Sequence, residues 1–370
     1  MTLKKAVAVV ALFLVVTAAG PAAQQQIPAF NRYEVLSVLE VYLESLRQQS
    51  AIPGMSAAIV RGGVILWERG FGYSNVAGRI PATADTPYLV GDLSGTIASV
   101  LLLRCVEERR LELDQPVRRY GLSFQEPEVT LRQLLSHTST EGPGGTFAYS
   151  PERFAQISTA VEHCAPQPYR KSVAHRVLNR LAMVDSVPGT DLANADLPLP
   201  EGLFDATDLD RYRRVLKDRM AVPYRVDSKG RAERTSLAPT GITASGGLVT
   251  TVRDLAKFEG AIVPVPDSEI QTGLLLQETL DVAWTPAANR AGLAAPMGLG
   301  WFVQQYRGQK VVWHFGHVPN AYSSLVIRVP AYDLTFILLA NSDRLNAPFQ
   351  LQQGDINKSL FATVFLRLFT

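Results

Sequence analysis

The sequence has little net charge and few cysteines. Among its 370 residues, 36 basic and 34 acidic side chains leave a formal charge of +2 at pH 7, which is too small to indicate nucleic acid as a partner. Disordered or low-complexity composition is also absent, because 47% of the residues are hydrophobic and 19% are charged. These proportions are typical of a foldable globular chain.

The two cysteines, Cys105 and Cys164, are too few for a disulfide framework. Cys105 lies in a strongly apolar stretch with helical periodicity, where a cysteine is most often a buried free thiol. The sequence therefore favours free thiols. A bridge between the two residues is the alternative, since exported proteins can form disulfides.

One long apolar run is present, near the first residue. Lys4 and Lys5 precede an apolar stretch of small and aliphatic residues over 6–20, and further small residues follow it. This order is typical of a secretory signal peptide, and the stretch is shorter than the roughly 20 residues that a spanning helix needs. We expect a signal peptide over residues 1–23 and a periplasmic or secreted protein, with an uncleaved anchor as the alternative.

Hydrophobic periodicity divides the rest of the chain into helical and extended segments. Apolar residues at helical spacing predict helices over residues 33–49, 93–110, 131–136, 151–163, 171–183, 208–220, 251–262 and 348–368. Short runs rich in β-branched and aromatic residues predict strands over residues 55–61, 64–73, 300–306, 310–315, 322–329 and 334–340. Residues 188–202 combine proline, glycine and polar residues without periodicity and predict a long surface connection.

Strands at both ends of the chain, with helices between them, predict one antiparallel sheet assembled from both ends. Helices would cover that sheet, and a mainly helical region would be inserted into it. We therefore predict an α/β (α+β) fold with a single domain over residues 28–370. Its α/β part would comprise about 28–91 and 246–370, and its helical part about 92–245.

A set of segments in a fixed order resembles one enzyme family. They cover residues 52–60, 70–73, 86–96, 106–117, 129–139, 245–258, 298–301 and 339–342. Together they resemble the serine β-lactamase and penicillin-binding-protein family, specifically its class C β-lactamase and esterase branch. The resemblance implies a β-lactamase/transpeptidase-like fold, and acyl transfer to a serine as the activity typical of it.

The residues that carry this chemistry are the ones the chain lacks. The family's stretch reads roughly Thr-Pro-Phe-x-Ile-Gly-Ser-x-Ser-Lys-Thr, and the resemblance places Asp92 at its serine and Gly95 at its lysine. In Ser-x-x-Lys the lysine amine and the serine hydroxyl lie on the same face of the helix, so the amine can help to deprotonate the hydroxyl. Shifting the register to Ser94 pairs it with Ile97, which has no ionisable group. No lysine in the chain has a serine three residues before it.

Two further family motifs are partly kept. Phe-Ala-Tyr-Ser-Pro resembles Phe-x-Tyr-Ser-Asn, so Tyr149 retains the phenol, whereas Pro151 replaces the asparagine and suits the first turn of a helix. His314 and Gly316 fit His-x-Gly on a strand, where the imidazole would donate to a ligand. A packed core phenol and a structural strand histidine are equally good interpretations of Tyr149 and His314. His317 stands where the family usually has glycine and predicts a bulkier cleft edge.

The sequence thus predicts a family fold without acyl-enzyme chemistry. Asp92 is interpreted as a helix N-cap that accepts hydrogen bonds from first-turn amides, and the resemblance implies a cell-wall-peptide-like or small acyl ligand. The alternative is an active hydrolase (an esterase, D-peptidase or β-lactamase-like enzyme) with a misplaced serine, or with Asp92, Tyr149 and His314 rewired. No cofactor is expected, and the histidines and cysteines lack spacing such as His-Glu-x-x-His that would predict a metal site.

Overall fold

The computed structural model describes residues 32–126, 128–139, 145–264, 273–288 and 292–370. The predicted signal segment lies outside these residues. Within them, no helix has both the length and the apolar character needed to cross a bilayer.

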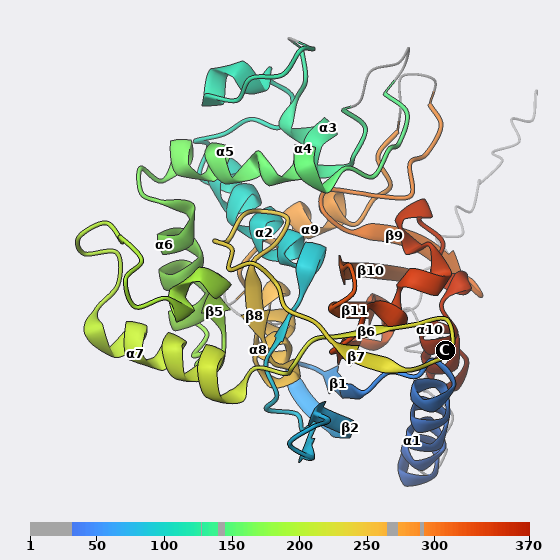
Figure 1. The fold of residues 1–370 in the computed structure, drawn as a ribbon. Helices are drawn as coiled ribbons and strands as arrows, with labels where there is room; N and C mark the ends of the chain where they lie inside the picture. The colour runs from blue at the N-terminus through green and yellow to red at the C-terminus, as the bar shows by residue number, and fades with distance from the viewer. Residues whose placement is uncertain (1–31, 127, 140–144, 265–272, 289–291) are drawn as a thin grey trace, which may run out of the picture.

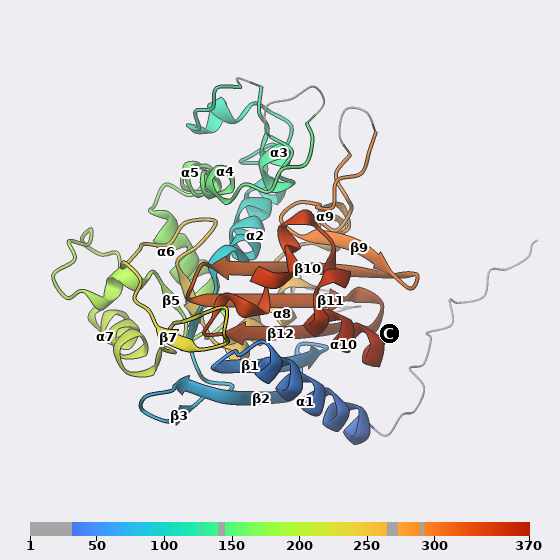
Figure 2. The same cartoon turned by 45° about the vertical axis from the view of Figure 1, so that its right-hand side comes forward.

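A seven-stranded antiparallel sheet joins the two ends of the described chain (Figures 1 and 2). The strands follow the order β3-β2-β1-β12-β11-β10-β9. Their bounds are Ile80–Pro81 (β3), Val64–Asn75 (β2), Gly54–Arg61 (β1), Leu334–Ala340 (β12), Tyr322–Val329 (β11), Gln309–Val318 (β10) and Phe302–Tyr306 (β9). β1 pairs with β12 from Met55↔Ala340 to Arg61↔Leu334. The predicted sheet from both ends of the chain is confirmed.

Each face of the sheet packs on its own hydrophobic cluster. Because side chains alternate along a strand, β12 places Phe336 in one cluster and Ile337 in the other. Helices α1 (Arg32–Gln49) and α10 (Leu360–Phe369) cover the first face, as Figure 2 shows. Helix α8 (Val252–Ile262) and the helical region cover the second.

The helical region is built around α2, which is buried along most of its length. Its elements are α2 (Ser94–Glu107), α3 (Leu131–Leu135), α4 (Pro151–Ala155), α5 (Ile157–Cys164), α6 (Tyr169–Val173), the π-helical turn η3 (Ala174–Asn179), α7 (Ala206–Arg214) and the π-helical turn η5 (Val215–Arg219). The single helix predicted over 151–163 is wrong, because the Gln156 amide bonds to the Arg153 carbonyl in a tighter turn that separates α4 from α5. The helix predicted over 348–368 is also too long, because Gly354 has a φ of +83° and the α-helix α10 begins only at Leu360.

Several short elements carry no sequence signal. They are a three-stranded sheet of β4 (Tyr88–Leu89), β8 (Leu248–Thr250) and β5 (Val187–Pro188), a hairpin of β6 (Tyr224–Val226) and β7 (Ala232–Arg234), and helix α9 (Gln277–Ala283). Strands of two or three residues are too short for alternation to be recognised. β5 and the 3-10 turn Thr190–Ala193 also give structure to part of the predicted surface connection.

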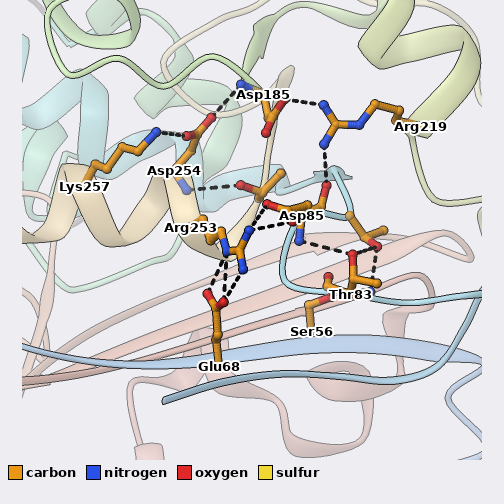
Figure 3. A network of polar contacts seen from close by, with 11 residues as sticks. Ser56, Glu68, Thr83, Asp85, Asp185, Arg219, Arg253, Asp254 and Lys257 are labelled. Atoms are coloured by element: carbon orange, nitrogen blue, oxygen red, sulfur yellow. Dashed lines mark hydrogen bonds and ion pairs between the residues drawn. The ribbon is translucent and has the colours of Figure 1, made fainter. Parts of the chain in front are cut away.

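An ion-pair network centred on Arg253 fastens α8 to the sheet and to the turn before β4 (Figure 3). Arg253 pairs with Glu68 of β2 and, through Nη1, with both carboxylate oxygens of Asp85 at 2.7 and 2.6 Å. Arg219 adds a bond of 2.9 Å to the Asp85 carbonyl and an ion pair with Asp185. Single exposed pairs contribute little, but this network joins five separate segments of the chain.

A disulfide joins Cys105 of α2 to Cys164 of α5, so the free thiols favoured by the sequence are wrong. The two Cα atoms are 6.1 Å apart, within the span that a disulfide bridges. α2 and α5 pack side by side and bring together residues that are 59 positions apart. Spacing in the sequence gives no sign of this helix packing.

Removing the bridge should destabilise the protein. In the chain-entropy account, closing a loop of this length contributes about 4 kcal/mol, so Cys105→Ser with Cys164→Ser should lower the free energy of unfolding by about 2–4 kcal/mol. Urea denaturation followed by circular dichroism measures this change. The matched pair Cys105→Ala with Cys164→Ala separates the lost cross-link from the cost of burying two hydroxyls. Reduced wild type, whose free thiols are verified by intact mass, should unfold at a lower urea concentration than the oxidised protein. The same urea midpoint for both forms contradicts the expectation.

Candidate functional site

The candidate site lies where a 3-10 turn before α2 meets β10. This turn, η1 (Gly91–Leu93), leads directly into the helix and contacts β10. Two glycines permit the contact. A Cβ at Gly316 would lie 1.7 Å from the Val90 carbonyl oxygen, and one at Gly91, whose φ is +57°, would lie 2.9 Å from the His317 amide nitrogen. Both positions therefore require glycine.

Asp92 stands in the middle of η1, and the prediction that it caps α2 is wrong. The N-cap is Leu93, whose helical φ and ψ continue the turn into α2, and no side chain caps the first amides. The Asp92 carboxyl instead lies beside the backbone amide of His317 at the end of β10. Burial raises the pKa of the Asp92 carboxyl to about 7, an effect that the His317 amide opposes and the charge of Glu152 reinforces.

Gly95 lies in the first turn of α2 and faces an aromatic ring. A Cβ at Gly95 would lie 3.1 Å from Cε1 of Phe154 and 3.7 Å from the carbonyl oxygen of Ala244. Any side chain here would have to displace the Phe154 ring by some tenths of an ångström. Ser94 is 1% exposed and donates its hydroxyl to the Gly91 carbonyl at 2.8 Å, so it is committed to the turn.

Tyr149 is packed in a stack of aromatic rings. The centroid of its ring lies 4.5 Å from that of His137, 5.7 Å from Phe302 and 5.3 Å from Phe315. Phe154 also stacks on His137, at 5.1 Å. Burial raises the pKa of the Tyr149 phenol well above its ordinary value, and the charge of Asp92 adds to this. The phenol is therefore protonated at neutral pH.

Pro151 occupies the first turn of α4, as the sequence predicts. Ser150 is the N-cap, and its hydroxyl accepts a hydrogen bond from the Arg153 amide at 3.3 Å. The Ser150 amide donates to Nδ1 of His137 at 2.9 Å. Burial lowers the pKa of His137 to about 3. Ser150 and Pro151 thus form a helix start, and the His137 imidazole beside it is neutral at pH 7.

His314 faces the interior of the protein and is 2% exposed. Its Nδ1 lies 2.7 Å from the Phe315 carbonyl oxygen, which can only accept, so Nδ1 carries the proton. Burial lowers the pKa of His314 to about 4, and the imidazole is neutral at pH 7. The ring lines a small internal cavity together with Glu259 and Arg328. His314 therefore brings no positive charge to Asp92.

The structure gathers most of the predicted positions. Asp92 and Tyr149 interact electrostatically, Gly316 lies under η1, and Pro151 begins the helix that carries Phe154. Sequence reasoning missed Glu152, Phe154, His137 and the His317 amide, because the sequence does not show that they pack on η1 and α2. In the described residues, no group of three or more His, Cys, Asp or Glu side chains is placed to hold a metal ion. The Asp92 carboxyl can exchange a proton near neutral pH, but no amine lies at the Gly95 position to activate a hydroxyl.

Solved structures share this architecture. The octameric penicillin-binding protein homologue from Pyrococcus abyssi has a TM-score of 0.70 at 21% identity, covering 90% of this chain and 77% of that one. The D-amino acid amidase from Ochrobactrum anthropi has a TM-score of 0.65 at 17% identity, covering 90% and 99%. The likeness shows the fold, which is the β-lactamase/transpeptidase-like fold predicted from the sequence.

Similarity in sequence extends to two kinds of relative. The human serine beta-lactamase-like protein LACTB, mitochondrial, is 31% identical over 104 residues, which are 26% of this chain and 19% of that protein. The match thus spans about a fifth of that relative. Protein flp of Staphylococcus aureus is 21% identical over 366 residues, covering 88% of this chain and 68% of that protein. A profile of the family described as Beta-lactamase matches residues 39–358. The chain belongs to the Beta-lactamase family.

Proposed function

We propose that this protein is an exported β-lactamase-related protein that does not form an acyl-enzyme. One observation carries the proposal, namely the side chains found at the two reacting positions. Where the family has its serine, Asp92 carries a carboxyl beside the His317 amide. Where the family has its lysine, Gly95 packs on the Phe154 ring. The scaffold around them is that of a serine hydrolase.

The size of the catalytic loss supports this proposal. In subtilisin, a worked example of such measurements, removing the nucleophile alone lowers turnover about a million-fold. This chain lacks the serine hydroxyl and the lysine amine, and Pro151 removes the asparagine as well. Stabilisation of an oxyanion by backbone amides without a nucleophile leaves only weak hydrolysis.

Export and ligand class complete the proposal. The signal-peptide pattern at residues 1–23 and the Cys105–Cys164 disulfide support export, since disulfides persist in oxidising compartments. A cell-wall-peptide-like or small acyl ligand is proposed by analogy with the fold. The penicillin-binding-protein homologue and the amidase, whose structure holds L-phenylalanine amide, support this class.

One observation favours an active hydrolase as a second candidate. The Asp92 carboxyl has a pKa of about 7 and lies close enough to Tyr149 and Glu152 for their charges to interact. Such a group can accept or donate a proton at neutral pH. Ester hydrolysis would then depend on Asp92 and would not label a serine.

Covalent labelling tests the proposal. Mature protein incubated with a fluorescent penicillin and with a fluorophosphonate should gain no mass, because no activated serine is present. Asp92→Ser with Gly95→Lys should also label poorly, since the lysine meets Phe154, and adding Phe154→Ala should increase labelling by making room. Intact-mass spectrometry and in-gel fluorescence measure the adducts.

The outcomes separate the candidates. An adduct on the native protein that maps to a serine overturns the non-acylating proposal. Turnover of a chromogenic ester that vanishes in Asp92→Asn, without any serine adduct, replaces it with the second candidate. Glu152→Gln is the matched control, because it removes a neighbouring carboxylate and leaves Asp92 in place.

The Asp92 pKa predicts how stability depends on pH. In the unfolded chain this carboxyl titrates near pH 4, but in the folded protein near pH 7. Between these values folding retains a proton that the unfolded chain has lost, so wild type loses stability as the pH rises from about 4 to about 7. Asp92→Asn cannot ionise and should escape this loss. We expect its free energy of unfolding at pH 8 to exceed that of wild type by on the order of 1–2 kcal/mol, which is less than the full pKa shift would give because the side chain is partly exposed.

Urea midpoints measured between pH 4 and pH 8 check this expectation. Wild type and Asp92→Asn should have similar stability at pH 4 and diverge above it. Parallel stability curves for the two proteins over the whole range contradict a raised pKa at Asp92. Glu152→Gln again serves as a control for charge at the site.

A further inference from the structure

A small polar cavity lies inside the protein, on the face of the sheet that α2 and α8 cover. Its lining comes from these helices, from β10 and β11 and from the residue after α9, and its charged and polar members include Glu259, Trp284, His314 and Arg328. Each of these four residues is at most 5% exposed. The centre of a water-sized sphere has about 10 Å³ in which to move there, which is close to the room that one water molecule needs.

Three polar atoms of the lining have no hydrogen-bond partner among the described residues. Nε1 of Trp284 is a buried donor without an acceptor. His314 donates through Nδ1 to the Phe315 carbonyl, which leaves its Nε2 as an acceptor without a donor. Glu259 holds Arg328 through Oε2 at 3.2 Å, whereas its Oε1 receives no hydrogen bond. Polar groups buried in this way destabilise the fold unless something pairs with them.

The mixture of donor and acceptors decides what can occupy the cavity. The indole N–H offers a proton, whereas imidazole Nε2 and a carboxylate oxygen each accept one. An anion such as chloride would be repelled by Glu259 and would bring no proton to His314. A cation would leave the Trp284 N–H unpaired and would lie close to Arg328. A water molecule both accepts and donates, so a single one can pair with all three atoms.

We propose that one structural water molecule occupies this cavity and bridges Trp284, His314 and Glu259. It accepts the indole N–H and donates its two protons to Nε2 of His314 and Oε1 of Glu259. The bridge connects the histidine of β10 to the ion pair between Glu259 of α8 and Arg328 of β11, and it holds the His314 ring in the interior. The inference depends on the cavity alone and not on the absence of acyl-enzyme chemistry.

Labelling of the indoles gives a direct readout of the water. The chain has four tryptophans, so nitrogen-15 labelling of their indoles gives few signals, and Trp284→Phe identifies the one of interest. The Trp284 indole proton should show cross-peaks to water of opposite sign in laboratory-frame and rotating-frame Overhauser spectra. This pattern marks a water molecule that stays bound and distinguishes it from proton exchange and from surface hydration.

Trp313 is the matched control within the same spectrum. Its indole is also buried without a partner among the described residues. The residue borders the cavity, but its ring stacks on Phe302 with centroids 4.2 Å apart, in the hydrophobic cluster on the other face of the sheet. Its indole proton should therefore show no cross-peak to bound water.

Filling the cavity distinguishes a water site from an empty cavity. Val326 lines the cavity from β11, and Val326→Leu adds a methylene group that should displace the water. The Trp284 cross-peak should then disappear and the urea midpoint should fall, because three polar groups lose their partner. An empty cavity would instead gain packing contacts, and the midpoint would rise. Val329→Leu, on the opposite face of the same strand, measures the cost of enlarging a buried valine away from the cavity.

The result that overturns the proposal is a wild-type Trp284 indole without a cross-peak to bound water. A cross-peak that persists in folded Val326→Leu, or a urea midpoint of that variant above the wild-type value, overturns it as well. If Val326→Leu does not fold, Val312→Ile, which reaches the same cavity from β10, asks the same question. Labelling of a serine would overturn the proposed function and leave this inference unchanged.

Discussion

The pairing of β1 with β12 is the interaction on which the rest of the structure depends. It joins the first hairpin to the last four strands and so makes one sheet from segments up to 285 residues apart along the chain (Met55↔Ala340). Its register decides which side chains of β12 enter each hydrophobic cluster, and a slip of one residue would exchange the two faces. α2 and η1 can meet β10 only because this sheet and its covering helices are in place.

The contact between η1 and β10 shows that scaffold and chemistry are separable. Gly91 and Gly316 are fixed by close approach of two backbones, whatever side chain stands between them. Asp92 is not held by such an approach, and at Gly95 only the Phe154 ring limits a side chain, so these two positions are not set by the backbone contact itself. A motif can therefore keep its glycines and its geometry while its nucleophile and amine are absent.

The longer strands, their assembly into one sheet and the main helices could be predicted because their hydrophobic periods extend over many residues. β4 and β5 could not, because two residues establish no period. Neither could the Cys105–Cys164 bridge or the Phe154 ring beside Gly95, since both depend on how separate helices pack. The N-cap prediction for Asp92 was wrong for a local reason, because η1 continues into α2 and places residue 92 inside the turn. Pro151 was correctly placed, because its fixed φ suits a helix start in any context.

The ionisable groups around the start of α2 give the site its charge. A serine and lysine pair would give the helix start a cation, whereas this chain places a carboxyl at Asp92 and no charge at Gly95. His137 and His314 cannot replace the missing cation, because burial keeps both imidazoles neutral at pH 7. Glu152 adds a second carboxylate whose charge reaches Asp92. The sign of the charge at this helix start is therefore opposite to that of a serine and lysine pair, and anionic ligands are repelled where a catalytic lysine would attract them.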